Sequence, residues 1–175
     1  MNKTILHTAA FAAAAALAAP AFAAELPQSA ELRYSGSYGI PAVMTFTRNG
    51  NNYKIVSNIK VPLYSIRFES GGTISGNTLR PTYYKDVRSG KTYAEARFSG
   101  GKVTYGKPGE QKTESVAGPT MDLFTLAWQL AANDAKLPAG LKITNGKKLY
   151  NVGGLSPAGS SQFSIAGGRT TVNKY

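Results

Sequence analysis

Short turn signals recur along most of the chain, and the stretches between them alternate between apolar and polar residues. Gly and Asn adopt the positive φ angles that tight hairpins need. They occur in pairs or beside Ser at Asn49-Gly50, Gly71-Gly72, Gly76-Asn77, Ser89-Gly90, Gly100-Gly101, Asn145-Gly146, Gly153-Gly154 and Gly167-Gly168. Residues 42–47, 53–60 and 93–98 alternate with a period of two, which is typical of strands that bury one face. The sequence therefore predicts a mainly β single domain with a curved antiparallel sheet, as a half-barrel, a barrel or a sandwich.

One segment, residues 120–133, has helical rather than strand periodicity. Its apolar residues fall three or four positions apart, at Leu123, Leu126, Ala127, Leu130 and Ala131. Thr120 is the expected N-cap, and Asp122 falls in the first turn, where the helix dipole favours an anion. We therefore expect one packed amphipathic helix, with Trp128 buried between helix and sheet. The alternative is a lid over a ligand cavity.

The first 23 residues have the order of a secretory signal peptide. Lys3 supplies a positive start, residues 8–19 form an apolar stretch, and Ala21-Phe22-Ala23 is a small-residue cleavage site. The apolar stretch is too short for a transmembrane helix. The sequence thus predicts cleavage after Ala23 and a single β-rich periplasmic domain over residues 24–175.

Few residue types for catalysis or metal binding would remain after that cleavage. The chain has no Cys, and its one His, His7, lies in the predicted signal peptide. Disulfides, a Ser-His-Asp triad and a His-based zinc site are therefore excluded for the mature chain, and we expect no metal and no cofactor. Asp86 and Glu95 could face each other across the Ser89-Gly90 hairpin, although their basic neighbours favour ion pairing. A non-enzyme is the main prediction, and a carboxylate-dependent glycan hydrolase is the alternative.

Basic residues outnumber acidic ones, with 20 Lys and Arg against 9 Asp and Glu. The densest stretch interleaves cations with tyrosines, and it supplies the candidate binding residues Arg80, Tyr83, Tyr84, Lys85, Arg88 and Arg97. Such a surface can bind single-stranded nucleic acid, but an exported protein rarely meets it, so none is expected. Anionic lipid, lipopolysaccharide or a cell-wall component is the expected partner. The alternation puts Lys85 and Arg88 on opposite strand faces. A generally basic surface without a site is the alternative.

Several short motifs carry a resemblance over most of the mature chain. They are Leu32-Arg33-Tyr34, Gly39-Ile40-Pro41-Ala42, Tyr53-Lys54-Ile55, Leu79-Arg80-Pro81-Thr82-Tyr83 and Met121-Asp122-Leu123-Phe124-Thr125-Leu126. In these motifs the chain resembles the exported bacterial proteins grouped as domain of unknown function 3108. The resemblance implies framework roles for Arg80-Pro81 and Asp122, with Pro81 fixing a turn and Asp122 fixing the helix start.

The resemblance also implies a curved sheet similar to that of periplasmic lipoprotein carriers. No activity is established for the family, so the expected function stays general. It is a non-enzymatic periplasmic protein that binds a hydrophobic or anionic cell-envelope component or serves envelope assembly. Surface adhesion is a further alternative.

Overall fold

The first part of the fold is an eight-stranded antiparallel sheet whose strands follow sequence order. The computed structural model describes residues 26–35, 40–165 and 168–174, so the predicted signal peptide lies outside the described residues. The strands are β1 (Ser29–Ser35), β2 (Pro41–Asn49), β3 (Asn52–Val61), β4 (Tyr64–Ser75), β5 (Thr78–Arg88), β6 (Lys91–Ser99), β7 (Lys102–Gly106) and β8 (Lys112–Ser115). Within the described ranges the sheet does not close into a barrel, because β1 and β8 are its edges. The predicted curved sheet is confirmed as an open one.

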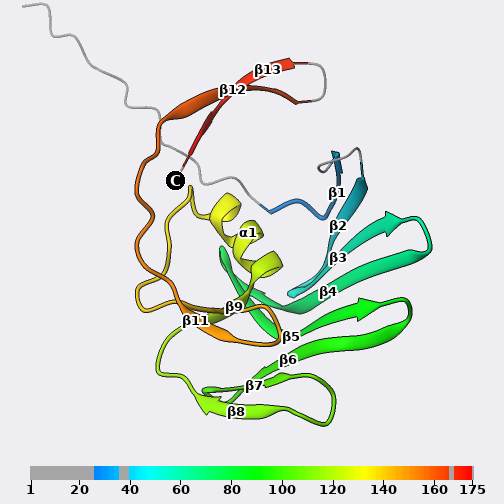
Figure 1. Ribbon diagram of the computed structural model, residues 1–175. Helices are drawn as coiled ribbons and strands as arrows, with labels where there is room; N and C mark the ends of the chain where they lie inside the picture. Colours follow the sequence, from blue (N-terminus) through cyan, green and yellow to red (C-terminus); the bar gives the residue numbers. More distant parts are fainter. Residues whose placement is uncertain (1–25, 36–39, 166–167, 175) are drawn as a thin grey trace, which may run out of the picture.

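The second part of the chain lies against one face of this sheet, except for its last hairpin, which lies apart from that face (Figure 1). It contains β9 (Thr120–Asp122), α1 (Leu123–Ala132), β10 (Lys142–Thr144), β11 (Leu149–Asn151), β12 (Ser160–Ile165) and β13 (Gly168–Asn173). β9 pairs in parallel with β10, β10 pairs with β11, and β12 pairs with β13. Figure 1 shows α1 in the hollow of the curved sheet, and we call the face toward α1 the inner face. Among the described residues, no helix has the length and apolarity to span a membrane.

The predicted helix exists, but the prediction of Thr120 as its N-cap is wrong. Thr120 begins β9, which continues through Met121 to Asp122, so the residues after Thr120 are extended and the helix starts only at Leu123. Asp122 is the N-cap, and its Oδ1 accepts hydrogen bonds from the N–H groups of Phe124 and Thr125 at 2.9 and 3.0 Å. Asp122 therefore fixes the helix start, as the resemblance implies, from the cap position rather than from the first turn.

The inner face and α1 enclose an aromatic and aliphatic core. Trp128 is 9% exposed and stacks on Phe46 with 4.4 Å between ring centroids, which confirms its predicted burial. Ile55 and Leu79 complete the same cluster. Gln129 of α1 accepts a hydrogen bond from the Leu79 N–H at 2.7 Å, which ties the helix to β5.

A buried hydrogen-bond network links α1 to the middle of the sheet. Asp122 Oδ2 accepts hydrogen bonds from the hydroxyls of Ser70 at 2.6 Å and Thr125 at 2.7 Å. The Thr125 hydroxyl also lies 2.8 Å from the Tyr53 hydroxyl. Burial raises the pKa of Asp122, and the hydrogen bonds from Ser70, Thr125 and Phe124 oppose that rise.

Pro81 does not fix a turn, contrary to the implied role. It lies inside β5 opposite Gly72, where the β4–β5 register shifts and Thr82 is left without a partner. A Cβ on Gly72 would lie 2.0 Å from the Arg80 carbonyl oxygen, so only glycine fits against this part of β5. Pro81 is tolerated in the strand because it sits beside an irregularity, where regular pairing is already interrupted.

Removing the Trp128 side chain should cost about 3–5 kcal/mol of unfolding free energy, as large-to-small core substitutions do. The measurement is urea denaturation of Trp128→Ala. Leu123→Ala is the control on the same helix, because the Leu123 side chain is 46% exposed, and its loss should be much smaller. Similar small losses in both variants would contradict the packing of α1 on the sheet.

The Asp122→Asn variant should change how stability depends on pH. Because the folded-state pKa of Asp122 is raised, the folded protein binds more protons than the unfolded chain between the two pKa values. The stability that Asp122 contributes is therefore full below its unfolded pKa of about 3.9 and falls as the pH rises through the folded pKa. The free-energy difference between wild type and Asp122→Asn should fall accordingly, as measured by urea denaturation from about pH 3 to pH 8.

Comparing the two proteins removes the contribution of other groups. Glu114, whose pKa is lowered by the hydrogen bond from Tyr105, gives the opposite slope, but it does so in both proteins. Tyr53 has a raised pKa because it is buried, so it ionises well above this range. A difference that stays flat or grows with pH would contradict the raised pKa of Asp122.

Candidate functional site

The candidate binding residues from the sequence are divided between several surroundings. Tyr84 is 2% exposed and its side chain belongs to the core. Arg88 lies on the inner face, where it pairs with Asp86. Lys85 lies on the outer face, so the two residues are on different faces of the strand, as the alternation predicts. Arg80 is exposed and lines a separate cavity near the start of β5.

Four of the candidates line one cavity at the outer face, where Tyr84 lies beneath the other three. A cavity of about 400 Å³ is lined by Glu69, Glu95 and the candidates Tyr83, Lys85 and Arg97. In the strand register Lys85 lies between Glu69 and Glu95. Glu69 also pairs with Arg67 at 2.7 Å. Positive and negative side chains thus alternate here, and this balance does not favour an anionic ligand.

The Asp86 and Glu95 carboxylates do not face each other. Asp86 lies opposite Ala94 on the inner face and is 3% exposed. Glu95 lies opposite Lys85 on the outer face. Neighbouring positions on a strand point to opposite faces, so the pair cannot act on one glycosidic bond from the two sides.

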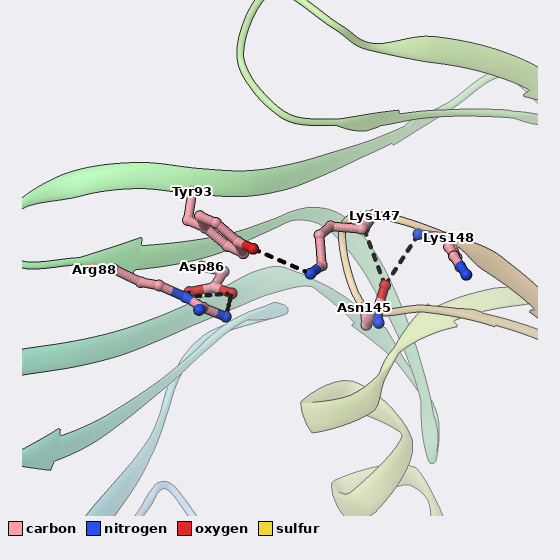
Figure 2. Close-up of polar contacts among 6 residues, drawn as sticks. All are labelled: Asp86, Arg88, Tyr93, Asn145, Lys147 and Lys148. Atoms are coloured by element: carbon pink, nitrogen blue, oxygen red, sulfur yellow. Dashed lines mark hydrogen bonds and ion pairs between the residues drawn. The ribbon is translucent and has the colours of Figure 1, made fainter.

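A cluster of cations around one aromatic ring lies at the inner face (Figure 2). The Arg88 guanidinium lies 3.7 Å from the centroid of the Tyr93 ring and donates to Asp86 at 2.9 and 3.1 Å. Lys147 Nζ lies 4.8 Å from the same centroid and 3.4 Å from the Tyr93 hydroxyl. The hydrogen bond to Asp86 raises the pKa of Arg88, so this guanidinium stays charged. We call Asp86, Arg88, Tyr93 and Lys147 the Tyr93 cluster.

A register shift between β5 and β6 and the β10–β11 turn together form the Tyr93 cluster. The β5–β6 register shifts after Asp86, and Tyr93 is left without a partner strand residue. Lys147 comes from the β10–β11 turn, where the Asn145 side chain accepts hydrogen bonds from the Lys147 and Lys148 N–H groups at 3.0 Å each. Figure 2 shows the Lys147 side chain directed toward Tyr93 and that of Lys148 directed away.

Gly146 allows this turn to sit directly on the core. Its φ angle is +83°, and a Cβ there would lie 2.8 Å from the Tyr84 ring and 3.2 Å from the Ala94 side chain. A larger residue would therefore lift the turn and carry Lys147 away from Tyr93. The sequence predicts a turn at Asn145-Gly146, but it does not identify Tyr93 or Lys147 as a site residue.

A strip of partly exposed apolar side chains leads along the inner face toward the cluster. Residues directly opposite in an antiparallel pair share a face. Ile66 is opposite Arg88, and Phe68 is opposite Asp86. The inner strip consists of Leu32, Tyr34, Met44, Ile59, Ile66 and Phe68. Leu32 is 38% exposed and Tyr34 49%, so this part of the inner face is accessible.

Helix α1 borders the inner strip rather than covering it. The Phe124 ring lies 5.0 Å from that of Phe68, where the core and the strip meet. Apolar surface on one side and excess positive charge at one end are the two features that an amphiphilic anion requires. Among the described residues, no group of three or more acidic side chains is placed to hold a metal ion.

Comparison with protein families gives one match. A family model described as protein of unknown function (DUF3108) matches residues 31–172. Neither the curated proteins nor the solved structures contain a match. The matched span includes the sheet, α1, the inner strip and the Tyr93 cluster.

Proposed function

The chain belongs to the DUF3108 family, and we propose that it is a non-enzymatic cell-envelope protein that binds an anionic amphiphile on the inner face of its sheet. The alkyl chain lies on the inner strip, and the anionic head contacts the Tyr93 cluster. The observation that carries this proposal is the direct continuity between the two, because Ile66 of the strip is the strand partner of Arg88.

The charges of the Tyr93 cluster favour an anion. Arg88 and Lys147 supply two positive charges against the one carboxylate of Asp86. The Lys147 ammonium group has three N–H donors, and within the described part of the chain it donates to the Tyr93 hydroxyl alone, which leaves donors for a ligand. Charge-assisted hydrogen bonds to a phosphate or carboxylate are among the strongest that such groups make.

The inner strip supplies the affinity for an alkyl chain. Transfer of apolar surface out of water stabilises a complex by about 25 cal/mol per Å². The strip lies on regular strands, so its side chains are held in place before binding. The hydrolase alternative has no comparable support, since Asp86 and Glu95 lie on opposite faces. Periplasmic location remains part of the proposal and rests on the signal-peptide pattern of residues 1–23.

Lys147→Gln should weaken binding of dodecyl phosphate about tenfold, equivalent to about 1.4 kcal/mol. The physical reason is the loss of a charge-assisted contact to the head group. Isothermal titration calorimetry below the critical micelle concentration measures the affinity. Lys147 is exposed, so the variant should fold normally.

Lys148→Gln is the matched control for this prediction. It removes the same charge from the neighbouring exposed residue, whose side chain points away from Tyr93 (Figure 2). Its affinity should equal that of wild type, and dodecyl trimethylammonium, with a cationic head, should bind neither protein well. Equal losses in both lysine variants would indicate a generally basic surface and no site.

The exported protein should begin at Ala24. The prediction follows from the Ala21-Phe22-Ala23 cleavage pattern. Intact mass spectrometry of a periplasmic extract, after expression of the full chain in a Gram-negative bacterium, measures it. Recovery of a protein that retains residues before Ala21 would contradict both the processing and the proposed location.

A further inference from the structure

A larger cavity lies near the other end of β5, where β5 and β6 separate. The β5–β6 pairing begins at Tyr83 and Arg97, so the first residues of β5 are not paired with the last residues of β6. Pro81 has no N–H with which to extend the pairing, and Thr82 lies at the irregularity. The cavity between the two strands has a volume of about 580 Å³. Small-molecule sites fall in a range of roughly 300–1,000 Å³.

Backbone hydrogen bonds hold the walls of this cavity in place. The residues before β9 form one wall, and the Val116 N–H donates to the Gly101 carbonyl at 2.8 Å. At the other end of this wall, the Lys142 N–H donates to the Pro119 carbonyl at 3.0 Å. Gly118 lies so close to the Gly140 carbonyl that a Cβ would be 2.8 Å from its oxygen. The cavity is therefore formed before any ligand arrives.

The lining combines positive charge with apolar surface. Its charged residues are Arg80 and Lys102, and no Asp or Glu lines it. Over the ranges that the structure describes, neither cation has a carboxylate within ion-pair distance. The apolar lining residues with accessible surface are Phe98, Val116 and Pro119, and the buried residues Leu79, Pro81 and Met121 lie behind them. The hydroxyls of Thr78, Ser99 and Thr120 add further polar groups.

We propose that this cavity binds a small organic anion with an aromatic body of one or two ring systems. Arg80 and Lys102 contact the anionic group, and the apolar lining contacts the rings. The cavity is lined by none of the residues of the Tyr93 cluster. The site is therefore separate from the proposed amphiphile site and does not depend on it.

A pair of fluorescent probes tests the proposal. Anilinonaphthalene sulfonate carries two aromatic groups and one anion, and phenylnaphthylamine has the same rings without the sulfonate. Fluorescence titration of the folded protein should show saturable binding of the sulfonate and at least about tenfold weaker binding of the neutral amine. Arg80→Gln and Lys102→Gln should each weaken sulfonate binding about tenfold and leave binding of the amine unchanged.

Three further variants locate the binding. Ser99→Phe places a ring at the exposed rim of the cavity and should abolish sulfonate binding while the thermal unfolding transition stays cooperative. Lys91→Gln, at an exposed cation outside this lining, should leave sulfonate binding unchanged, and Lys147→Gln reports whether any of the probe binds at the Tyr93 cluster instead. Loss of binding in Lys147→Gln with full binding in Arg80→Gln would place the probe on the inner strip and overturn this proposal alone. Equal affinities for the two probes, or no effect of Ser99→Phe, would overturn it as well.

Discussion

The buried carboxylate of Asp122 is where α1, β3 and β4 are joined. It caps the helix through Phe124 and Thr125 and accepts a hydrogen bond from Ser70 on β4. Thr125 extends the network to Tyr53 on β3. A buried carboxylate is destabilising unless it is hydrogen-bonded. Any other position of α1 on the sheet would break the hydrogen bond between Asp122 and Ser70, so the observed position is strongly favoured. That position decides which part of the inner face is core and which part remains accessible as the inner strip.

Local patterns in the sequence account for most of the fold. The period-two alternation predicts the strands of the meander because each strand buries one face against the same core. The error at Thr120 has a different origin. Thr120 and Asp122 are both good caps. The parallel pairing with β10, whose residues lie 22 positions further along the chain, keeps β9 extended through Asp122 and so selects Asp122 as the cap. Pro81 was misplaced for a similar reason, since its place in β5 depends on Gly72 in the neighbouring strand.

The candidate sites were less predictable, because both lie where β5 departs from regular pairing. Alternation separates Lys85 from Arg88 correctly, but it cannot show that Tyr84 faces the core or that Tyr93 lies at an irregularity. Lys147 reaches Tyr93 across 54 residues of chain. The basic residues of the stretch 80–97 are divided among the outer face, the Tyr93 cluster and the cavity near Arg80. Density of charge along the chain is therefore a poor guide to density of charge in space.

An open sheet has two edges, and unpaired strand edges recruit other strands into aggregates. Here the terminal strands differ in how they limit this risk. β8 has only four residues, and two of them, Lys112 and Glu114, form an ion pair along the strand. β1 is longer, with seven residues, and carries the Glu31–Arg33 ion pair. Short length and charge oppose sheet-to-sheet association at β8, whereas at β1 charge alone does so. At high salt, where ion pairs are screened, the β1 edge of this sheet therefore loses its protection, while β8 keeps that of its short length.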